Sequence, residues 1–141
     1  MRRTLLLAAL PAVLGAQTPE QLFQQRRFTE ARTAAQARLA NDRNDANALY
    51  WMGRLAAAEN KNSEAAGWFE KAIKRDERNA IYHLWLGNVV GNEAQRANKL
   101  RQPFLARRVK SEFELAVQLD PKLVDARAGL VNFYSMAPGF M

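Results

Sequence analysis

Few side chains in this sequence could perform catalysis, and they form no recognisable catalytic constellation. The 141 residues contain one histidine, His83, and no cysteine, which excludes thiolate nucleophiles, cysteine-ligated zinc and disulfide bonds. Glu112 and Glu114 lie two residues apart, so on a helix they would face different directions and could not act as a paired acid and base. No metalloprotease, nucleophile-elbow or phosphate-loop motif is present. We therefore expect no catalytic residue, no metal site and no cofactor, and we expect His83 to be a packing residue.

Basic side chains are the most concentrated chemical feature. Lysine and arginine together number 21 against 14 acidic residues, a formal net charge of +7. Six of them crowd residues 96–110: Arg96, Lys99, Arg101, Arg107, Arg108 and Lys110. Such a patch could bind anionic lipid, a cell-wall polymer or an acidic partner. The alternative is a solvated helix face whose basic side chains cover apolar surface with their stems. No nucleic-acid-binding motif is present, and we expect no nucleic acid partner.

The first sixteen residues have the pattern of a Sec-type signal peptide. Arg2 and Arg3 precede an apolar run over residues 5–14, and the small residues Gly15 and Ala16 follow as alternative cleavage sites. The run is about half as long as a membrane span. The alternative is an N-terminal apolar helix that packs on the domain or anchors it in a membrane. Export predicts a periplasmic or secreted protein, with membrane contact only through this segment or the basic patch.

The rest of the chain predicts an all-α protein with an internal repeat. It has 25 alanines against seven glycines and five prolines, a balance that favours helices. Small and aromatic residues recur with an offset of about 34 residues, and we interpret them as packing positions between helices: Gly53, Ala65, Phe69, Ala72, Gly87, Phe113, Ala116 and Pro121. Phe113, Ala116 and Pro121 fall about ten residues late, which predicts an insertion.

This spacing resembles the tetratricopeptide repeat (TPR), a unit of about 34 residues that folds as two antiparallel helices. The resemblance covers the chain from about residue 18 and implies an antiparallel helix-hairpin solenoid over residues 17–136. Its units are a partial repeat at 18–45, a repeat at 46–79, a repeat at 80–122 with its insertion near 92–104, and a partial repeat at 123–136. A short first helix is expected at about 19–26.

The C-terminal part also resembles exported bacterial TPR proteins. The similarity lies in residues 105–140 and around Tyr82 to Gly87, and such proteins usually continue beyond the corresponding segment. We therefore expect the tail at 137–141 to be cut short. The apolar last helix, at 124–136, would then be an uncovered solenoid end, which predicts self-association.

The resemblance also implies where a ligand binds. TPR arrays bind protein or peptide partners in the groove lined by the first helix of each unit, and the groove-facing positions here are Asn47, Tyr50, Arg54, Leu84, Asn88, Asp125 and Asn132. Trp51 and Trp85 are either interface anchors or core residues. The basic residues with which some TPR proteins grip a terminal carboxylate are absent. The predicted function is a non-catalytic protein-binding scaffold or adaptor of the bacterial cell envelope. The alternative is an envelope factor that binds anionic lipid or polymer through the basic patch.

Overall fold

The computed structural model describes residues 15–136, which form seven α-helices and no strand. The all-α prediction is therefore confirmed for this part of the chain. The helices are α1 (Pro19–Gln24), α2 (Phe28–Asn41), α3 (Ala46–Ala58), α4 (Asn62–Arg75), α5 (Ala80–Arg96), α6 (Gln102–Leu119) and α7 (Val124–Met136). The predicted C-terminal tail and all but the end of the predicted signal peptide lie outside the described residues.

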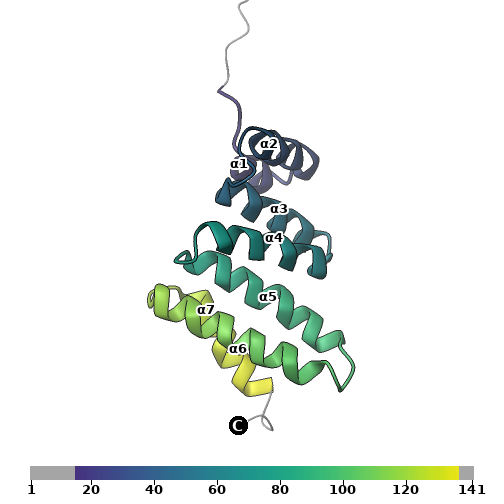
Figure 1. Cartoon of the computed structure of the whole chain (residues 1–141), viewed down its shortest axis with the longest axis vertical. Coiled ribbons are helices and arrows are strands. Elements are labelled where there is room, and N and C mark those ends of the chain that lie inside the picture. Colours follow the sequence, from purple (N-terminus) through teal and green to yellow (C-terminus); the bar gives the residue numbers. More distant parts are fainter. Residues whose placement is uncertain (1–14, 137–141) are drawn as a thin grey trace, which may run out of the picture.

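Helices α3, α4, α5 and α6 follow one another along the long axis of the molecule, with α1 and α2 together at one end and α7 overlapping α6 at the other (Figure 1). Turns of three to five residues join them, so neighbouring helices run antiparallel. The odd-numbered helices also contact one another: α1 contacts α3, α3 contacts α5, and α5 contacts α7. These four helices therefore form one continuous layer. This layer is the face on which the groove was predicted.

The sequence sets the helix boundaries through side-chain caps. At the start of α1 a capping box joins Thr18, the residue before Pro19, to Gln21 in the first turn. At the starts of α3 and α5 the side chains of Asp45 and Asn79 accept hydrogen bonds from backbone N–H groups. After α2, α4 and α6 an aspartate closes the turn by accepting the N–H two residues later: Asp42, Asp76 and Asp120. The first helix ends at Gln24, slightly earlier than predicted, because Arg26 has a left-handed backbone with φ of 60°.

The core is built from small residues that admit aromatic rings. An ideal Cβ on Gly53 would lie 2.6 Å from Cε1 of Phe69, and one on Gly87 would lie 2.7 Å from Cε1 of Phe113. A side chain at either position would collide with the ring, so glycine is needed for this close approach. Ala65, Ala72 and Ala116 are fully buried, whereas Pro121 lies exposed in the α6–α7 turn.

The insertion lengthens one hairpin and adds no separate loop domain. Helices α5 and α6 have 17 and 18 residues, whereas α3 and α4 have 13 and 14. Only residues 97–101 lie outside the helices at this place. The basic patch therefore extends from the last residue of α5 through the turn into the first half of α6. Within residues 15–136, no helix combines the length and apolar character needed to cross a membrane.

Candidate functional site

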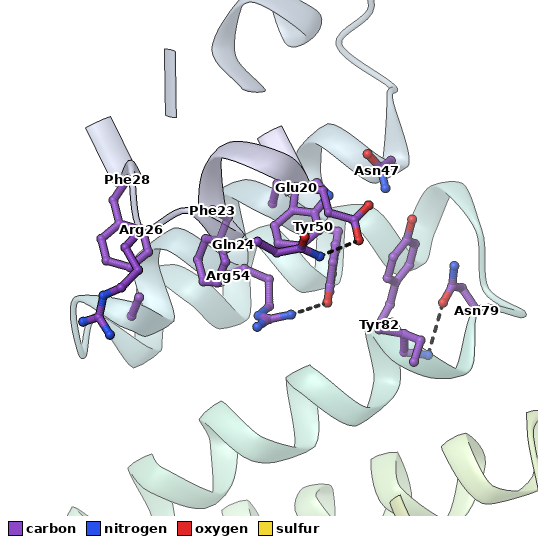
Figure 2. A pocket seen from close by; sticks show the side chains of 13 residues that line it. Glu20, Phe23, Gln24, Arg26, Phe28, Asn47, Tyr50, Arg54, Asn79 and Tyr82 are labelled. Atoms are coloured by element: carbon purple, nitrogen blue, oxygen red, sulfur yellow. Dashed lines mark hydrogen bonds between the residues drawn. The ribbon is translucent and has the colours of Figure 1, made fainter. Parts of the chain in front are cut away.

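A broad pocket opens where α1, α3 and the start of α5 meet, and we name it the Arg54 pocket. Its volume is about 850 Å³, and its lining includes Phe23, Asn47, Tyr50, Trp51, Arg54 and Tyr82. Figure 2 shows Arg54 and Tyr50 pointing toward each other from α3, with Phe23 and Gln24 of α1 beside them and Tyr82 and Asn79 at the α5 end. The short helix α1 thus supplies a wall of the pocket.

Arg54 is fixed in this pocket by aromatic rings. Its guanidinium carbon lies 3.6 Å from the ring centroid of Trp85, and 5.0 Å and 5.5 Å from those of Phe23 and Trp51. The distance to Trp85 is that of a stacked cation–π pair. Nη1 of Arg54 donates a hydrogen bond of 2.7 Å to the hydroxyl oxygen of Tyr50. The remaining guanidinium N–H groups can bind a carbonyl or carboxylate oxygen of a ligand.

Tyr50 is nearly buried and links two hairpins. Its ring stacks on that of Tyr82 with centroids 5.2 Å apart and packs near Phe69 at 5.8 Å. Burial raises the pKa of the Tyr50 phenol, and the nearby charge of Arg54 opposes that rise only in part. Tyr50 therefore stays a neutral phenol at physiological pH and can position Arg54 without competing for its charge.

Asn47 lies at the rim of the same pocket. Its Oδ1 accepts a hydrogen bond of 3.0 Å from Arg38, whose guanidinium also binds both carboxylate oxygens of Asp45 at 2.7 and 3.0 Å. These contacts orient the Asn47 side chain through α2. Its amide nitrogen remains a donor for a backbone carbonyl of a bound peptide.

A second pocket, which we name the glycine pocket, opens between α5, α6 and α7. Its volume is about 450 Å³, and Gly87, Gly91 and Gly129 lie in its wall beside Phe113 and Val109. Five amide side chains surround these apolar residues: Asn88, Asn92, Gln95, Gln102 and Asn132. The pocket thus combines room for an apolar side chain with donors and acceptors for a peptide backbone.

The glycine pocket lies where the repeat changes one residue type. The sixth residue is Trp51 in α3 and Trp85 in α5, but Gly129 in α7. Trp85 packs over Phe69 with ring centroids 6.4 Å apart, whereas an ideal Cβ on Gly129 would lie 2.9 Å from the ring of Phe113. Helix α7 therefore approaches Phe113 through its backbone, and Gly129 supplies no side chain to the groove.

The predicted groove residues lie partly in the Arg54 pocket and partly in the glycine pocket. Asn47, Tyr50 and Arg54 line the Arg54 pocket, and Asn88 and Asn132 line the glycine pocket. Asp125 is exposed on α7 and lines neither pocket.

The assignment of Leu84 to the groove is wrong. Its side chain is only 4% exposed and belongs to the main core, because α5 packs against both α4 and α6 and has little free surface at this position. Trp51 is likewise buried in the core, whereas Trp85 is half-buried and stacks on Arg54.

His83 is buried, as expected of a packing residue, and its ring also makes two polar contacts that the sequence did not predict. Its ring is buried, with Nδ1 2.7 Å from a carboxylate oxygen of Glu112 and Nε2 2.9 Å from the carbonyl oxygen of Glu77. Both partners are acceptors, so the ring donates to both of them only when it is protonated. The hydrogen bond to Glu112 is the main cause of a raised pKa of His83, which burial opposes. Glu114 instead pairs with Lys110 at 3.8 Å, so the two glutamates do face different partners.

The basic patch is only partly available for a ligand. Arg108 pairs with Glu70 of α4, and Lys110 pairs with Glu114. Among residues 15–136, Arg96, Lys99, Arg101 and Arg107 have no salt bridge and are exposed. Side-chain partners on other helices could not be predicted from the local sequence.

Sequence reasoning missed several lining residues. Phe23 was missed because its place depends on how α1 folds back onto α3, and Gly91 was missed because only the packing of α7 turns it into a pocket wall. The replacement of tryptophan by glycine at position 129 was visible in the sequence and was the signal that could have located the glycine pocket.

No protein family model matches the sequence, and no curated protein matches it. Solved structures match its fold. The chain superposes on a thermophilic TPR protein of Thermus thermophilus with a TM-score of 0.75 at 18% identity, covering 85% of this chain and 62% of that one. It superposes on the Yersinia enterocolitica type III secretion chaperone SycD, in complex with a peptide of the translocator YopD, with a TM-score of 0.69 at 12% identity, covering 84% and 88%.

A third match is a mutant of the O-GlcNAc transferase of Thermobaculum terrenum, with a TM-score of 0.69 at 22% identity, covering 82% of this chain. The chain spans only 20% of that transferase. Together with the stacked hairpins and the groove on the odd-numbered helices, these matches define an all-helical protein with the TPR fold.

Proposed function

We propose that this protein is a non-catalytic scaffold or adaptor that binds an extended peptide segment of a protein partner along the groove of α1, α3, α5 and α7. The observation that carries the proposal is the pair of pockets on this layer, about 850 and 450 Å³, both lined in part by α5. Arg54, already stacked on Trp85, would bind a carbonyl or carboxylate oxygen of the peptide at little further cost in side-chain entropy. The peptide bound to the structurally similar SycD supports this kind of partner.

The glycine pocket would select the side chain of the peptide. An apolar or aromatic side chain could enter beside Gly91 and Phe113, while Asn88 and Asn132 bind the flanking backbone. The peptide would thus be held by polar contacts at one pocket and by an apolar anchor at the other.

Paired glycine substitutions test this function. An ideal Cβ on Gly91 would lie 3.9 Å from the nearest atom of Val109, and one on Gly67 of α4 has nothing within 4 Å, so both positions have room for a Cβ. Peptides selected from a random phage library against the full chain would then be measured by fluorescence anisotropy. Gly91→Leu should weaken their binding about tenfold or more by filling the pocket. Gly67→Leu should leave it unchanged.

Arg54 provides the second arm of this experiment. Arg54→Gln should weaken the same peptides, whereas Arg127→Gln on the exposed part of α7 should not. If selected peptides bind Gly91→Leu and Arg54→Gln as tightly as the unaltered chain, the groove is not their binding site and the proposal is wrong.

The role in the cell envelope is part of the proposal and rests on the sequence of residues 1–16, which has the pattern of an export signal. Crosslinking in the native cell, followed by mass spectrometry, would test both location and partner. Recovery of envelope proteins is expected, and recovery of cytoplasmic proteins alone would contradict this role.

A second candidate function is the binding of anionic lipid or polymer through the basic patch. It is favoured by four residues of the basic patch that are exposed and form no salt bridge within residues 15–136: Arg96, Lys99, Arg101 and Arg107. Salt separates the two functions, because binding by exposed charges should collapse between low and physiological ionic strength. Binding in the groove, anchored by apolar contacts, should persist.

A further inference from the structure

The turn between α5 and α6 has a fixed shape. Both the backbone oxygen and Oδ1 of Asn98 accept hydrogen bonds from the N–H of Arg101, at 3.1 and 3.0 Å, and the N–H of Gln102 also donates to the Asn98 carbonyl. The Gln102 side chain donates to the carbonyl of Ala94 at 3.4 Å. These bonds close a turn that places Lys99 and Leu100 at its corner, at the end of the extended hairpin.

Two large apolar side chains at this hairpin end are exposed. Leu100 is 82% exposed and Phe104 is 70% exposed, four residues apart in the chain. Single exposed apolar side chains are common on protein surfaces, but a neighbouring pair held out by an ordered turn indicates a contact with an apolar phase or partner. The other large apolar side chains of the described chain that are more than 60% exposed all lie on α7.

Uncompensated positive charge surrounds this pair. The chain has no aspartate or glutamate between Glu93 and Glu112, and both of these carboxylates have partners elsewhere. Glu93 accepts a hydrogen bond from Ser63 of α4, and Glu112 binds His83. The charges of Lys99 and Arg101 beside Leu100 are therefore free to meet an anionic surface.

We propose that this hairpin end is a membrane contact, in which Leu100 and Phe104 insert into the interface of an anionic bilayer while the basic residues around them bind lipid headgroups. A bilayer offers both phosphate charge and hydrocarbon at one surface, which matches an apolar tip within a basic ring. A soluble acidic polymer would neutralise the charges but leave both apolar side chains in water. The membrane contact deepens the second candidate function and is independent of the peptide groove, because Leu100 and Phe104 line neither pocket.

The absence of cysteine from the sequence allows a site-specific test. Leu100→Cys, in the full chain, would be labelled with the environment-sensitive fluorophore NBD, and Thr29→Cys on α2, where the native side chain is exposed, is the control. Both are titrated with vesicles of phosphatidylcholine, with and without phosphatidylglycerol. The label at 100 should brighten and shift to the blue only with phosphatidylglycerol, and the label at 29 should not respond.

Charge and apolar variants complete the design. Lys99→Gln with Arg101→Gln should lower vesicle partitioning about thirtyfold, whereas Lys122→Gln with Arg127→Gln should change it little. Phe104→Ser should lower partitioning about tenfold, and Ile81→Ser, at an exposed apolar residue of α5, should not.

Each alternative result has a definite meaning. If charge removal weakens vesicle binding but the label at 100 stays in water, the patch binds lipid without insertion and the proposed contact is wrong. If poly-L-glutamate binds through Lys99 and Arg101 while vesicles do not bind, the surface serves an acidic polymer or protein, and the membrane proposal is again wrong. If the binding of neither vesicles nor poly-L-glutamate depends on these charges, the second candidate function is wrong as well. The proposed peptide groove is tested separately, by Gly91→Leu and Arg54→Gln.

Discussion

At the scale of single residues, His83 shows how one polar group can join three segments. Its ring binds Glu112 of α6 through Nδ1 and the carbonyl of Glu77 in the α4–α5 turn through Nε2. Buried polar groups need such partners, because an unpaired one costs about 1–3 kcal/mol. The arrangement is structural, since both ring nitrogens are already occupied and the ring lines neither pocket.

The raised pKa of His83 predicts a pH-dependent stability. At pH values between the pKa of His83 in the unfolded chain and its raised pKa in the folded protein, the folded protein binds more protons than the unfolded chain. The stability of the protein therefore falls as the pH rises through the folded pKa. Below the unfolded pKa the stabilisation by His83 is fully retained. Urea unfolding at a series of pH values from weakly acidic to alkaline should show this decline. Glu112→Gln should flatten it, because the hydrogen bond to Glu112 is its main cause.

Glu114→Gln is the control for this prediction. Glu114 lies on the same helix but pairs with Lys110 and does not contact His83. The Glu114→Gln variant should show the same decline in stability with rising pH as the unaltered chain. An equal slope in Glu112→Gln and in the unaltered chain would assign the pH dependence to another group.

At the scale of helices, close packing of glycine against phenylalanine positions the groove. Gly53 of α3 lies against Phe69 of α4, and Phe69 in turn supports Trp85 of α5, on which Arg54 stacks. The position of Arg54 thus depends on a chain of contacts through three helices. A change at Gly53 should be transmitted to the pocket through the same ring.

Gly53→Ala should therefore destabilise the protein although alanine is the better helix former. The added Cβ would overlap the Phe69 ring, and overpacking costs about 1–3 kcal/mol, against a gain of about 1 kcal/mol in helix propensity. Gly67→Ala adds a Cβ in open space and should stabilise the protein by up to about 1 kcal/mol. Denaturant unfolding measures both. A net gain in stability for Gly53→Ala would show that the ring moves aside freely.

At the scale of the whole molecule, the described solenoid has an open face at α7. This helix packs on α6 and only slightly on α5, and Val124, Val131 and Met136 are 63–72% exposed. Repeat arrays usually cover such a terminal face with a polar cap or another repeat. A second copy of the chain, or a further protein, could cover this one.

Self-association through α7 is the corresponding prediction. Val124→Glu with Val131→Glu should shift the protein toward monomer in sedimentation velocity, because each charge would have to be buried in the contact. Leu100→Glu, at a still more exposed apolar site on another part of the molecule, should not. A monodisperse monomer of the unaltered chain at high micromolar concentration would contradict the prediction.

The sequence by itself determined the helical class, the repeat and the packing positions. Small residues and phenylalanines at fixed offsets are local features of the chain, and Gly53 with Phe69 and Gly87 with Phe113 do meet in the structure. The resemblance to TPR proteins implied the groove positions, and five of the seven line a pocket. Periodicity predicts these features because it reports which face of a helix a residue occupies.

Only the tertiary structure decided which of those faces remained open. Leu84 has the periodicity of a groove residue but is buried, because α5 is covered by two neighbours. The pairing of Arg108 with Glu70, the bridge from His83 to Glu112 and the stacking of Arg54 on Trp85 each join residues about 30 or more positions apart. Such contacts depend on how the hairpins stack. They could not be predicted from the sequence because the partners that bury a side chain or neutralise its charge are distant in the chain.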